Sequence, residues 1–97
     1  MASARQRQLG NQERFRRANE RLHERIRAVL RDERPVPFLC ECADDTCMDP
    51  VHLTLDEYRR IRGRDANYLI IPGHPMIEGE DVVCENERYA VVEKRAA

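Results

Sequence analysis

The sequence predicts a small α+β protein, in which a long N-terminal helix precedes an antiparallel β domain with one further helix. Three observations support this prediction. Apolar residues recur at helical spacing near the N-terminus, short apolar runs separated by turn residues follow, and three of the four cysteines lie close together in the second part. We therefore divide the chain into an amphipathic, Arg-rich helix, residues 1–34, and a small α+β domain, residues 35–97.

The composition limits the size of the core. The chain has 97 residues, of which 36% are charged, and it has no Trp. No apolar run approaches the roughly 20 residues that span a bilayer, so no membrane contact is expected. Residues 1–8 lack the apolar segment of a secretory signal, so we expect a cytoplasmic protein. In that compartment clustered thiols bind metal or carry redox chemistry more often than they form disulfides.

The first helix is predicted to span residues 11–32, and residues 1–10 are expected to fray. Its apolar residues recur every three or four positions and form one stripe: Phe15, Ala18, Leu22, Ile26, Val29 and Leu30. His23 lies off this stripe and is expected in solvent. A helix of about 33 Å is longer than is needed to cover one side of the small α+β domain. The stripe is therefore predicted to pack on its own core or on a second copy, and the arginines offer a third contact, to nucleic acid.

The second part contains short elements in the order strand, strand, helix and three strands. A Thr54–Glu57 capping box opens the helix, which ends at Gly63. Residues 68–71 are a continuous apolar run, predicted to be a central strand. The other expected strands cover residues 36–40, 51–53, 81–85 and 88–93, and the last two form a hairpin around Asn86-Glu87.

Three cysteines, Cys40, Cys42 and Cys47, form a C-x-C-x4-C pattern between two apolar segments; we call residues 40–47 the knuckle. Alternate residues of a strand share a face and lie about 6.6 Å apart, so a modest turn brings the first two sulfurs onto one ion. The loop that follows contains two Asp residues, which favour the turn that returns Cys47. Zinc takes four nitrogen or sulfur ligands. The domain is thus predicted to be stapled by Zn²⁺, because a body of about 60 residues buries little surface.

Three residues compete for the fourth position on the zinc. His74 is preferred because it lies in a rigid Pro-Gly-His-Pro turn, where a core histidine would have little to pack against. Cys84 is an alternative, although its place between apolar neighbours on a strand predicts a small buried side chain. His52 is a further alternative, expected to point to solvent or to the rim of the knuckle because it alternates with apolar residues.

Several motifs occur together along nearly the whole chain. They are an Asn-, Glu- and Arg-rich helix over residues 11–25, Phe-Leu-Cys-Glu-Cys at 38–42, Cys47, the segment 51–58, Ile61-Arg62, Pro-Gly-His at 72–74 and the segment 89–94. This combination resembles a family of small, uncharacterised bacterial proteins, chiefly actinobacterial. The resemblance implies Cys40, Cys42, Cys47 and His74 as the ligand set and implies no activity. Cys84 matches no motif of that family.

An enzyme is not expected from these residues. Three thiolates and one histidine would close the shell of the metal and leave no position for a reacting water. The H-x-E that accompanies C-x2-C in zinc deaminases is absent. A cysteine nucleophile is also disfavoured, because acidic residues near Cys40 and Cys42 raise the pKa of a thiol.

The two parts of the chain carry opposite charge. Residues 1–34 hold ten Arg against five acidic residues, whereas residues 35–97 hold seven basic residues against thirteen acidic ones. The knuckle would repel phosphate, so any nucleic-acid contact falls to the helix. Four acidic residues lie in or beside the knuckle: Glu41, Asp44, Asp45 and Asp49.

The sequence therefore predicts a non-enzymatic, zinc-binding interaction or regulatory module. Its N-terminal helix is expected to contact a protein partner or a second copy. One alternative is a nucleic-acid-associated regulator that binds through the Arg-rich helix. The other is a thiol/zinc redox sensor, in which the three knuckle cysteines release zinc on oxidation.

Overall fold

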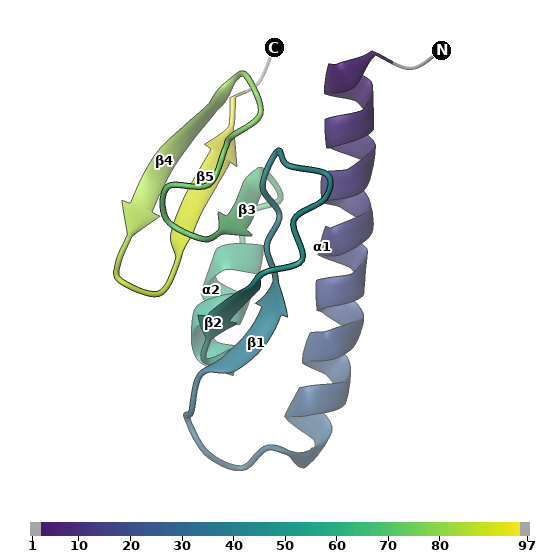
Figure 1. Cartoon of the computed structure of the whole chain (residues 1–97). Coiled ribbons are helices and arrows are strands. Elements are labelled where there is room, and N and C mark those ends of the chain that lie inside the picture. The colour runs from purple at the N-terminus through teal and green to yellow at the C-terminus, as the bar shows by residue number, and fades with distance from the viewer. Residues whose placement is uncertain (1–2, 96–97) are drawn as a thin grey trace.

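A long helix lies along one side of a body made of two small antiparallel sheets and a second helix in the computed structural model, which describes residues 3–95 (Figure 1). The elements are α1 (Ala4–Val29), β1 (Val36–Leu39), β2 (Pro50–Leu53), α2 (Leu55–Arg62), β3 (Asn67–Ile70), β4 (Glu80–Glu85) and β5 (Ala90–Lys94). One sheet pairs β1 with β2, and the other has the order β3-β5-β4. The predicted α+β class is confirmed. None of the described helices is long and apolar enough to cross a membrane.

Helix α1 begins seven residues before its predicted start. Ser3 is the N-cap: its hydroxyl accepts a hydrogen bond from the backbone N–H of Gln6 (3.1 Å), and the Gln6 side chain accepts one from the N–H of Ser3 (2.8 Å). This capping box holds the first turn, so the expectation that residues 1–10 fray was wrong for residues 4–10; residues 1–2 lie outside the described part. The helix ends three residues early, because Leu30 turns extended while its N–H still bonds Ile26.

The face of α1 that packs on the body is polar, which the apolar stripe did not predict. Gln12 and Asn19 are fully buried, whereas Val29 of the stripe is 75% exposed. The other stripe residues are only partly buried: Phe15, Ala18, Leu22, Ile26 and Leu30. Leu22, Ile26 and Leu30 do pack against the core cluster, as predicted for the stripe, but they do so from the flank of the helix. The fully buried positions of α1 hold hydrogen-bonding side chains.

His23 belongs to this buried face, so the expectation of a solvated histidine was wrong. Its ring stacks on Tyr58 of α2 (centroids 4.9 Å apart), and Tyr58 stacks in turn on Phe38 of β1 (4.5 Å). Burial, together with the positive charge of Arg59, lowers the pKa of His23. A neutral imidazole is accordingly the form that fits this aromatic stack.

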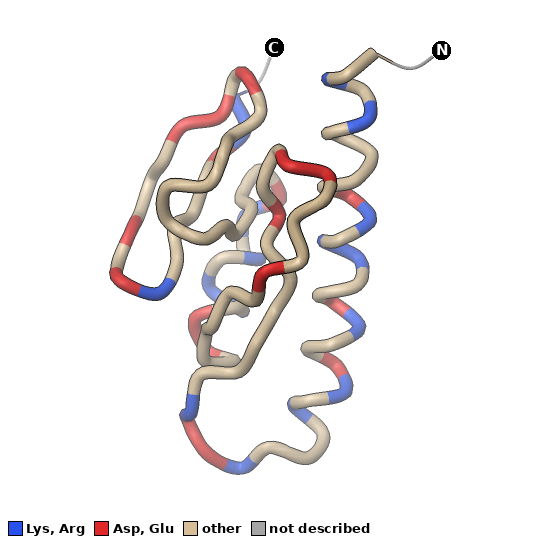
Figure 2. Tube along the Cα trace, in the orientation of Figure 1, with Lys and Arg blue, Asp and Glu red and all other residues tan. Residues whose placement is uncertain are grey.

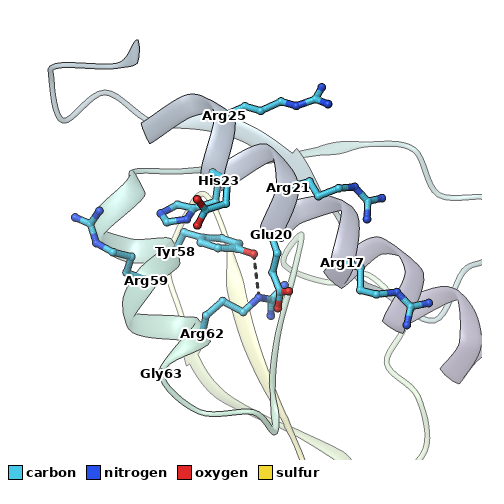
Figure 3. Close-up of a pocket in the computed structure, with 10 residues that line it drawn as sticks. Arg17, Glu20, Arg21, His23, Arg25, Tyr58, Arg59, Arg62 and Gly63 are labelled. Carbon is cyan, nitrogen blue, oxygen red and sulfur yellow. Dashed lines mark hydrogen bonds between the residues drawn. The ribbon is translucent and has the colours of Figure 1, made fainter. Parts of the chain in front are cut away.

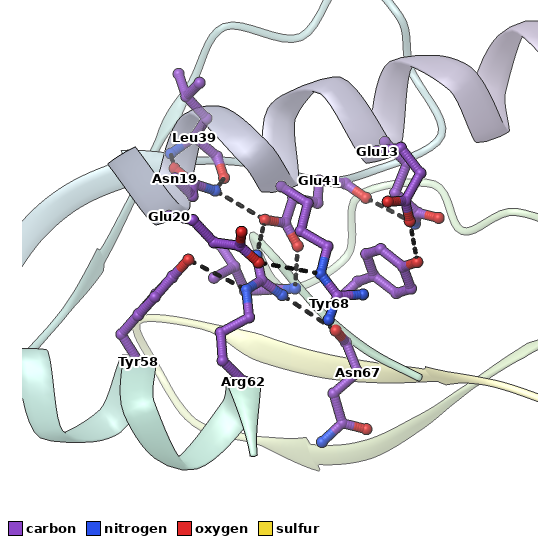
Figure 4. Close-up of polar contacts among 12 residues, drawn as sticks. Glu13, Asn19, Glu20, Leu39, Glu41, Tyr58, Arg62, Asn67 and Tyr68 are labelled. Atoms are coloured by element: carbon purple, nitrogen blue, oxygen red, sulfur yellow. Dashed lines mark hydrogen bonds and ion pairs between the residues drawn. The ribbon is translucent and has the colours of Figure 1, made fainter. Parts of the chain in front are cut away.

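Buried Glu41, the residue between Cys40 and Cys42, is the partner that the polar face of α1 meets (Figure 4). Its carboxylate accepts hydrogen bonds from the Asn19 amide (2.8 Å) and from the N–H of Leu69 (3.0 Å), and it forms an ion pair with Arg62 of α2. Its backbone carbonyl accepts a further hydrogen bond from Gln12 (3.2 Å). One carboxylate thus joins α1, α2 and β3.

Strand β3 is an edge strand, so the prediction that residues 68–71 form the central strand was wrong. Strand β5 lies between β3 and β4. All four residues of β3 are nevertheless buried, because the knuckle covers its outer edge. The N–H of Glu41 donates to the carbonyl of Leu69 (2.8 Å), and the Glu41 side chain takes the N–H of the same residue. The apolar run in β3 therefore reflects burial under the knuckle, and not a central position in the sheet.

The predicted capping box of α2 and the predicted hairpin are both confirmed, and they contact each other. Thr54 is the N-cap of α2, and the Glu57 side chain accepts its backbone N–H. The Glu57 carboxylate also accepts two 2.8 Å hydrogen bonds from the guanidinium of Arg88 in the hairpin turn. The Asn86 side chain accepts the N–H groups of Arg88 (2.8 Å) and Tyr89 (2.9 Å), which closes a turn of four residues. Strand β5 therefore begins at Ala90, later than expected.

Replacing Asn19 by alanine should destabilise the protein by about 2–4 kcal/mol. The substitution leaves the N–H and C=O of Leu39 and one oxygen of Glu41 without their partner, and each unsatisfied group costs about 1–3 kcal/mol. The matched control is Asn11→Ala, because Asn11 donates a single exposed hydrogen bond, to Asp45 (3.2 Å), and its loss should cost less than about 1 kcal/mol. Urea denaturation measures both; equal losses would contradict the anchoring role of Asn19.

Replacing Arg88 by glutamine should change how stability depends on pH. The hydrogen bonds from Arg88 lower the pKa of Glu57 to about 2, so the stabilisation is full above the ordinary value of 4.5 and is lost as the pH falls towards 2. The gap of about 1 kcal/mol between wild type and Arg88→Gln should therefore be largest near neutral pH and close in acid. Arg60→Gln is the control, because the exposed Arg60 forms no ion pair within residues 3–95. A gap that stays constant down to pH 2 would rule out this pair as its source.

Candidate metal centre

The structure brings Cys40, Cys42, Cys47 and His74 into one cluster. Their sulfur and nitrogen donor atoms all lie within 4.8 Å of one another. The sulfurs of Cys40 and Cys47 are each 3.6 Å from Nδ1 of His74. A tetrahedral zinc site with thiolates at about 2.3 Å and an imidazole at about 2.0 Å has a sulfur-to-nitrogen edge of about 3.5 Å. The donor atoms thus fit a tetrahedral metal ion in type, and the two sulfur-to-nitrogen distances fit it in spacing.

The first two ligand candidates follow β1 directly. Because strand-like backbone alternates, the side chains of Cys40 and Cys42 share one side, and Glu41 points to the other. The N–H of Ile71 donates to the sulfur of Cys40 (3.3 Å). Such a donor stabilises the negative charge that a thiolate ligand carries.

The third cysteine is returned by a tight loop, as the two Asp residues predicted. The Asp44 side chain accepts hydrogen bonds from the N–H (2.9 Å) and hydroxyl (2.7 Å) of Thr46. The carbonyl of Asp44 accepts the N–H of Cys47 (3.1 Å). These bonds reverse the chain within four residues and aim the third sulfur at the first two.

His74 is positioned by a turn that its flanking residues impose. Its N–H donates to the carbonyl of Ile71 (3.1 Å), with Pro72 second and Gly73 third in the turn, as in a type II β-turn. Gly73 has φ = 84°, a region that other residues rarely adopt. The next residue accepts a hydrogen bond from the knuckle: the carbonyl of Pro75 takes the N–H of Ala43 (2.8 Å). Ile71 therefore fixes both Cys40 and His74.

The three clustered thiols cannot all ionise without a compensating cation. Hydrogen bonding, first of all from Cys40, lowers the pKa of Cys42 to about 5. The same hydrogen bond and burial raise the pKa of Cys40, and burial raises the pKa of Cys47. The cluster thus favours one thiolate beside two thiols, and a divalent cation would supply the charge needed to ionise all three.

Two neighbouring residues were not recognised from the sequence as part of the site. Asp49 places a carboxylate oxygen 3.9 Å from Nε2 of His74, on the side of the ring away from the sulfurs. This distance is longer than a hydrogen bond, so the carboxylate lies near the ring without holding it in place. Glu41 was counted among the acids that make the knuckle repel phosphate, but it is fully buried and paired with Arg62. The alternation C-x-C was the available signal, because it turns the middle residue away from the ion.

The two alternative ligands lie outside the cluster. Cys84 is exposed on β4, so the prediction of a small buried side chain was wrong. A bulge between Val82 and Cys84 shifts the register of this edge strand, and five of its six residues are exposed. His52 is exposed on β2, in agreement with its alternation between apolar residues.

Comparison with known proteins gave no match. No protein-family model, no curated protein and no solved structure is similar to this chain. The resemblance to the actinobacterial family therefore stays a prediction, and the candidate site depends on its own geometry.

Cys84 should be the one cysteine that reacts rapidly with iodoacetamide in the folded protein. It is exposed, whereas the three cluster cysteines are between 1% and 8% exposed. Mass spectrometry of briefly alkylated native protein should show one added group, and Cys84→Ser should show none. A second thiol that reacts as fast as Cys84 would contradict the buried cluster.

Proposed function

We propose that this protein is a non-enzymatic module whose fold is held by a structural Zn²⁺ bound to Cys40, Cys42, Cys47 and His74. The observation that supports the proposal is the convergence of four donor atoms with the spacing of a tetrahedral site. Sulfur-rich sites of this kind favour zinc over the hard cations that prefer oxygen ligands.

A structural role is favoured over a catalytic one by the composition of the cluster. Four protein donors fill a tetrahedral shell, whereas catalytic zinc usually keeps one position for water or substrate. The three sulfurs are also buried among core residues, including Phe38 and Leu69. The ion would therefore add a link between three segments that hydrogen bonds already bring together: the end of β1, the knuckle and the turn after β3.

Replacing Cys40 by serine should cause loss of zinc and of cooperative folding. Binding of a structural zinc supplies on the order of 10 kcal/mol, more than the typical stability of a domain this small. Elemental analysis should give about one zinc per chain for the wild type and none for Cys40→Ser, and the thermal transition should disappear. Cys84→Ser is the matched control and should keep both zinc and melting temperature. Wild-type protein without a stoichiometric metal would refute the proposal.

The fourth ligand is tested by a second matched pair, His74→Ala and His52→Ala. Removing a zinc ligand should weaken zinc binding by at least about 10-fold, because mutation of a residue that only hydrogen-bonds to a ligand already lowers metal affinity by about that factor. His52→Ala removes an exposed imidazole outside the cluster and should leave zinc affinity unchanged. Competition with a chromophoric chelator measures the ratio; equal affinities would remove His74 from the ligand set.

A further inference from the structure

A ridge of four arginines runs along the outer side of α1. We call Arg14, Arg17, Arg21 and Arg25 the arginine ridge; they recur at spacings of three and four residues and are exposed or partly exposed on one stripe. Arg14, Arg21 and Arg25 each follow a buried residue of the docked face by two positions, and two positions turn an α-helix by about 200°. The buried residues of that face are Gln12, Asn19 and His23. The ridge therefore faces directly away from the body, as Figure 3 shows for Arg17, Arg21 and Arg25.

The acidic residues of α1 do not neutralise this ridge. Glu13 accepts a hydrogen bond from Tyr68 of the body. Glu20 pairs with Arg16 (3.6 Å), and Glu24 pairs with Arg27 (3.4 Å). Over residues 3–95, no ion pair or hydrogen bond involves a guanidinium of the ridge. Its four positive charges thus have no ion-pair partner in the described part of the chain.

This arrangement costs the helix stability. Like charges three and four positions apart destabilise an α-helix by about 0.2–0.5 kcal/mol for each pair. A solvent-facing surface that served only solubility would mix both signs of charge, as the exposed pair of Glu24 and Arg27 on the same helix does. The repulsion along the ridge would be relieved by a polyanion that lies across it.

We propose that the arginine ridge binds the phosphodiester backbone of a nucleic acid. The ridge is straight and rigid, and from Arg14 to Arg25 it is about 16 Å long, which equals the axial rise of about five nucleotides in one strand of duplex DNA. Sixteen of the seventeen Lys and Arg residues in the chain are arginines, so the positive surface is made of guanidinium groups, which fit phosphate oxygens in a two-pronged geometry.

The distribution of charge over the molecule orients such a complex. The acidic residues of the body gather in two places, the knuckle, which contacts α1 at Asn11, and the β4–β5 hairpin, which lies on the far side of the body from α1 (Figure 2). They are exposed: Asp44, Asp45, Asp49, Asp81, Glu85 and Glu87. A nucleic acid is therefore attracted to one side of the protein and repelled from the other. The groove between α1 and α2, of about 870 Å³, borders the ridge, because Arg17, Arg21 and Arg25 line it together with Glu20 and Glu24. The two glutamates make the groove a poorer phosphate site than the outer side of the helix.

Two other polyanionic surfaces fit the ridge less well. A membrane-binding helix needs large apolar side chains on the face that enters the lipid, and the ridge carries none. An acidic protein would have to present a straight row of carboxylates at matching intervals, whereas a nucleic acid has a regular row of phosphates in every sequence. The inference does not depend on the metal, because the ridge is built on α1 alone.

The test is the salt dependence of binding, measured by fluorescence anisotropy with the full-length, zinc-loaded protein. Labelled probes are a 20-base-pair DNA duplex, a single strand, an RNA of equal length and a polyglutamate peptide. Four phosphate contacts predict a slope of about −3.6 in log K against log salt, and binding about 100-fold weaker at 200 mM than at 50 mM salt. A variant in which all four ridge arginines are replaced by glutamine should flatten this slope, since each lost contact removes about one unit. Its substitutions are Arg14→Gln, Arg17→Gln, Arg21→Gln and Arg25→Gln.

The control variant removes the same charge elsewhere, at four exposed arginines outside the ridge: Arg34, Arg60, Arg64 and Arg95. It should keep the wild-type slope. Glutamine favours helix, so circular dichroism and zinc content should match wild type in both variants. Absence of nucleic-acid binding at 50 mM salt, equal loss in the two variants, or polyglutamate binding as tight as DNA would each overturn the proposal. The zinc measurement separates any of these results from failure of the metal site.

Discussion

The buried carboxylate of Glu41 is the interaction on which the rest of the structure depends. It lies between two candidate ligands, and backbone alternation points it away from the sulfurs. On that other side it receives Asn19 from α1, Arg62 from α2 and an N–H of Leu69 from β3. The segment Cys40-Glu41-Cys42 therefore belongs both to the candidate metal site and to the docking surface of the long helix, so a shift of one moves the other.

Burying this charge explains why the docked face of α1 is polar. Burial raises the pKa of Glu41, and the charge of Arg62 and the hydrogen bond from Asn19 oppose that rise. An unpaired carboxylate in the core would cost several kcal/mol, and breaking such a pair typically costs 3–5 kcal/mol. Asn19 and Gln12 are accordingly buried where an apolar side chain would leave the carboxylate and nearby carbonyls unsatisfied. The partly exposed apolar stripe is the consequence, because the helix can turn only one face inward.

The rotation of α1 also creates its outer surface. With hydrogen-bonding residues turned inward, the opposite side is left with arginines alone, while the glutamates fall on the flank and pair there. The electrostatic division of the sequence thus becomes a division in space: a cationic edge on α1 and an acidic rim on the knuckle and hairpin (Figure 2). Because Glu41 joins α1 to the body, the cationic edge and the acidic rim keep a fixed orientation relative to each other.

The sequence by itself determined the fold class, the α2 capping box, the hairpin and the four residues that meet in the cluster, because cap, turn and cysteine patterns act over a few neighbouring residues. The start of α1 could have been predicted from the sequence in the same way, since Ser3 and Gln6 form a local capping box. Only the tertiary structure decided which face of α1 is buried, that β3 lies at an edge, and that Glu41, His23 and Cys84 have the opposite exposure to that expected. The docked face of α1 and the burial of Glu41 depend on a carboxylate that finds donors in segments distant in sequence, and the places of β3 and Cys84 depend on the strand order of the sheet. No local pattern records such long-range partners.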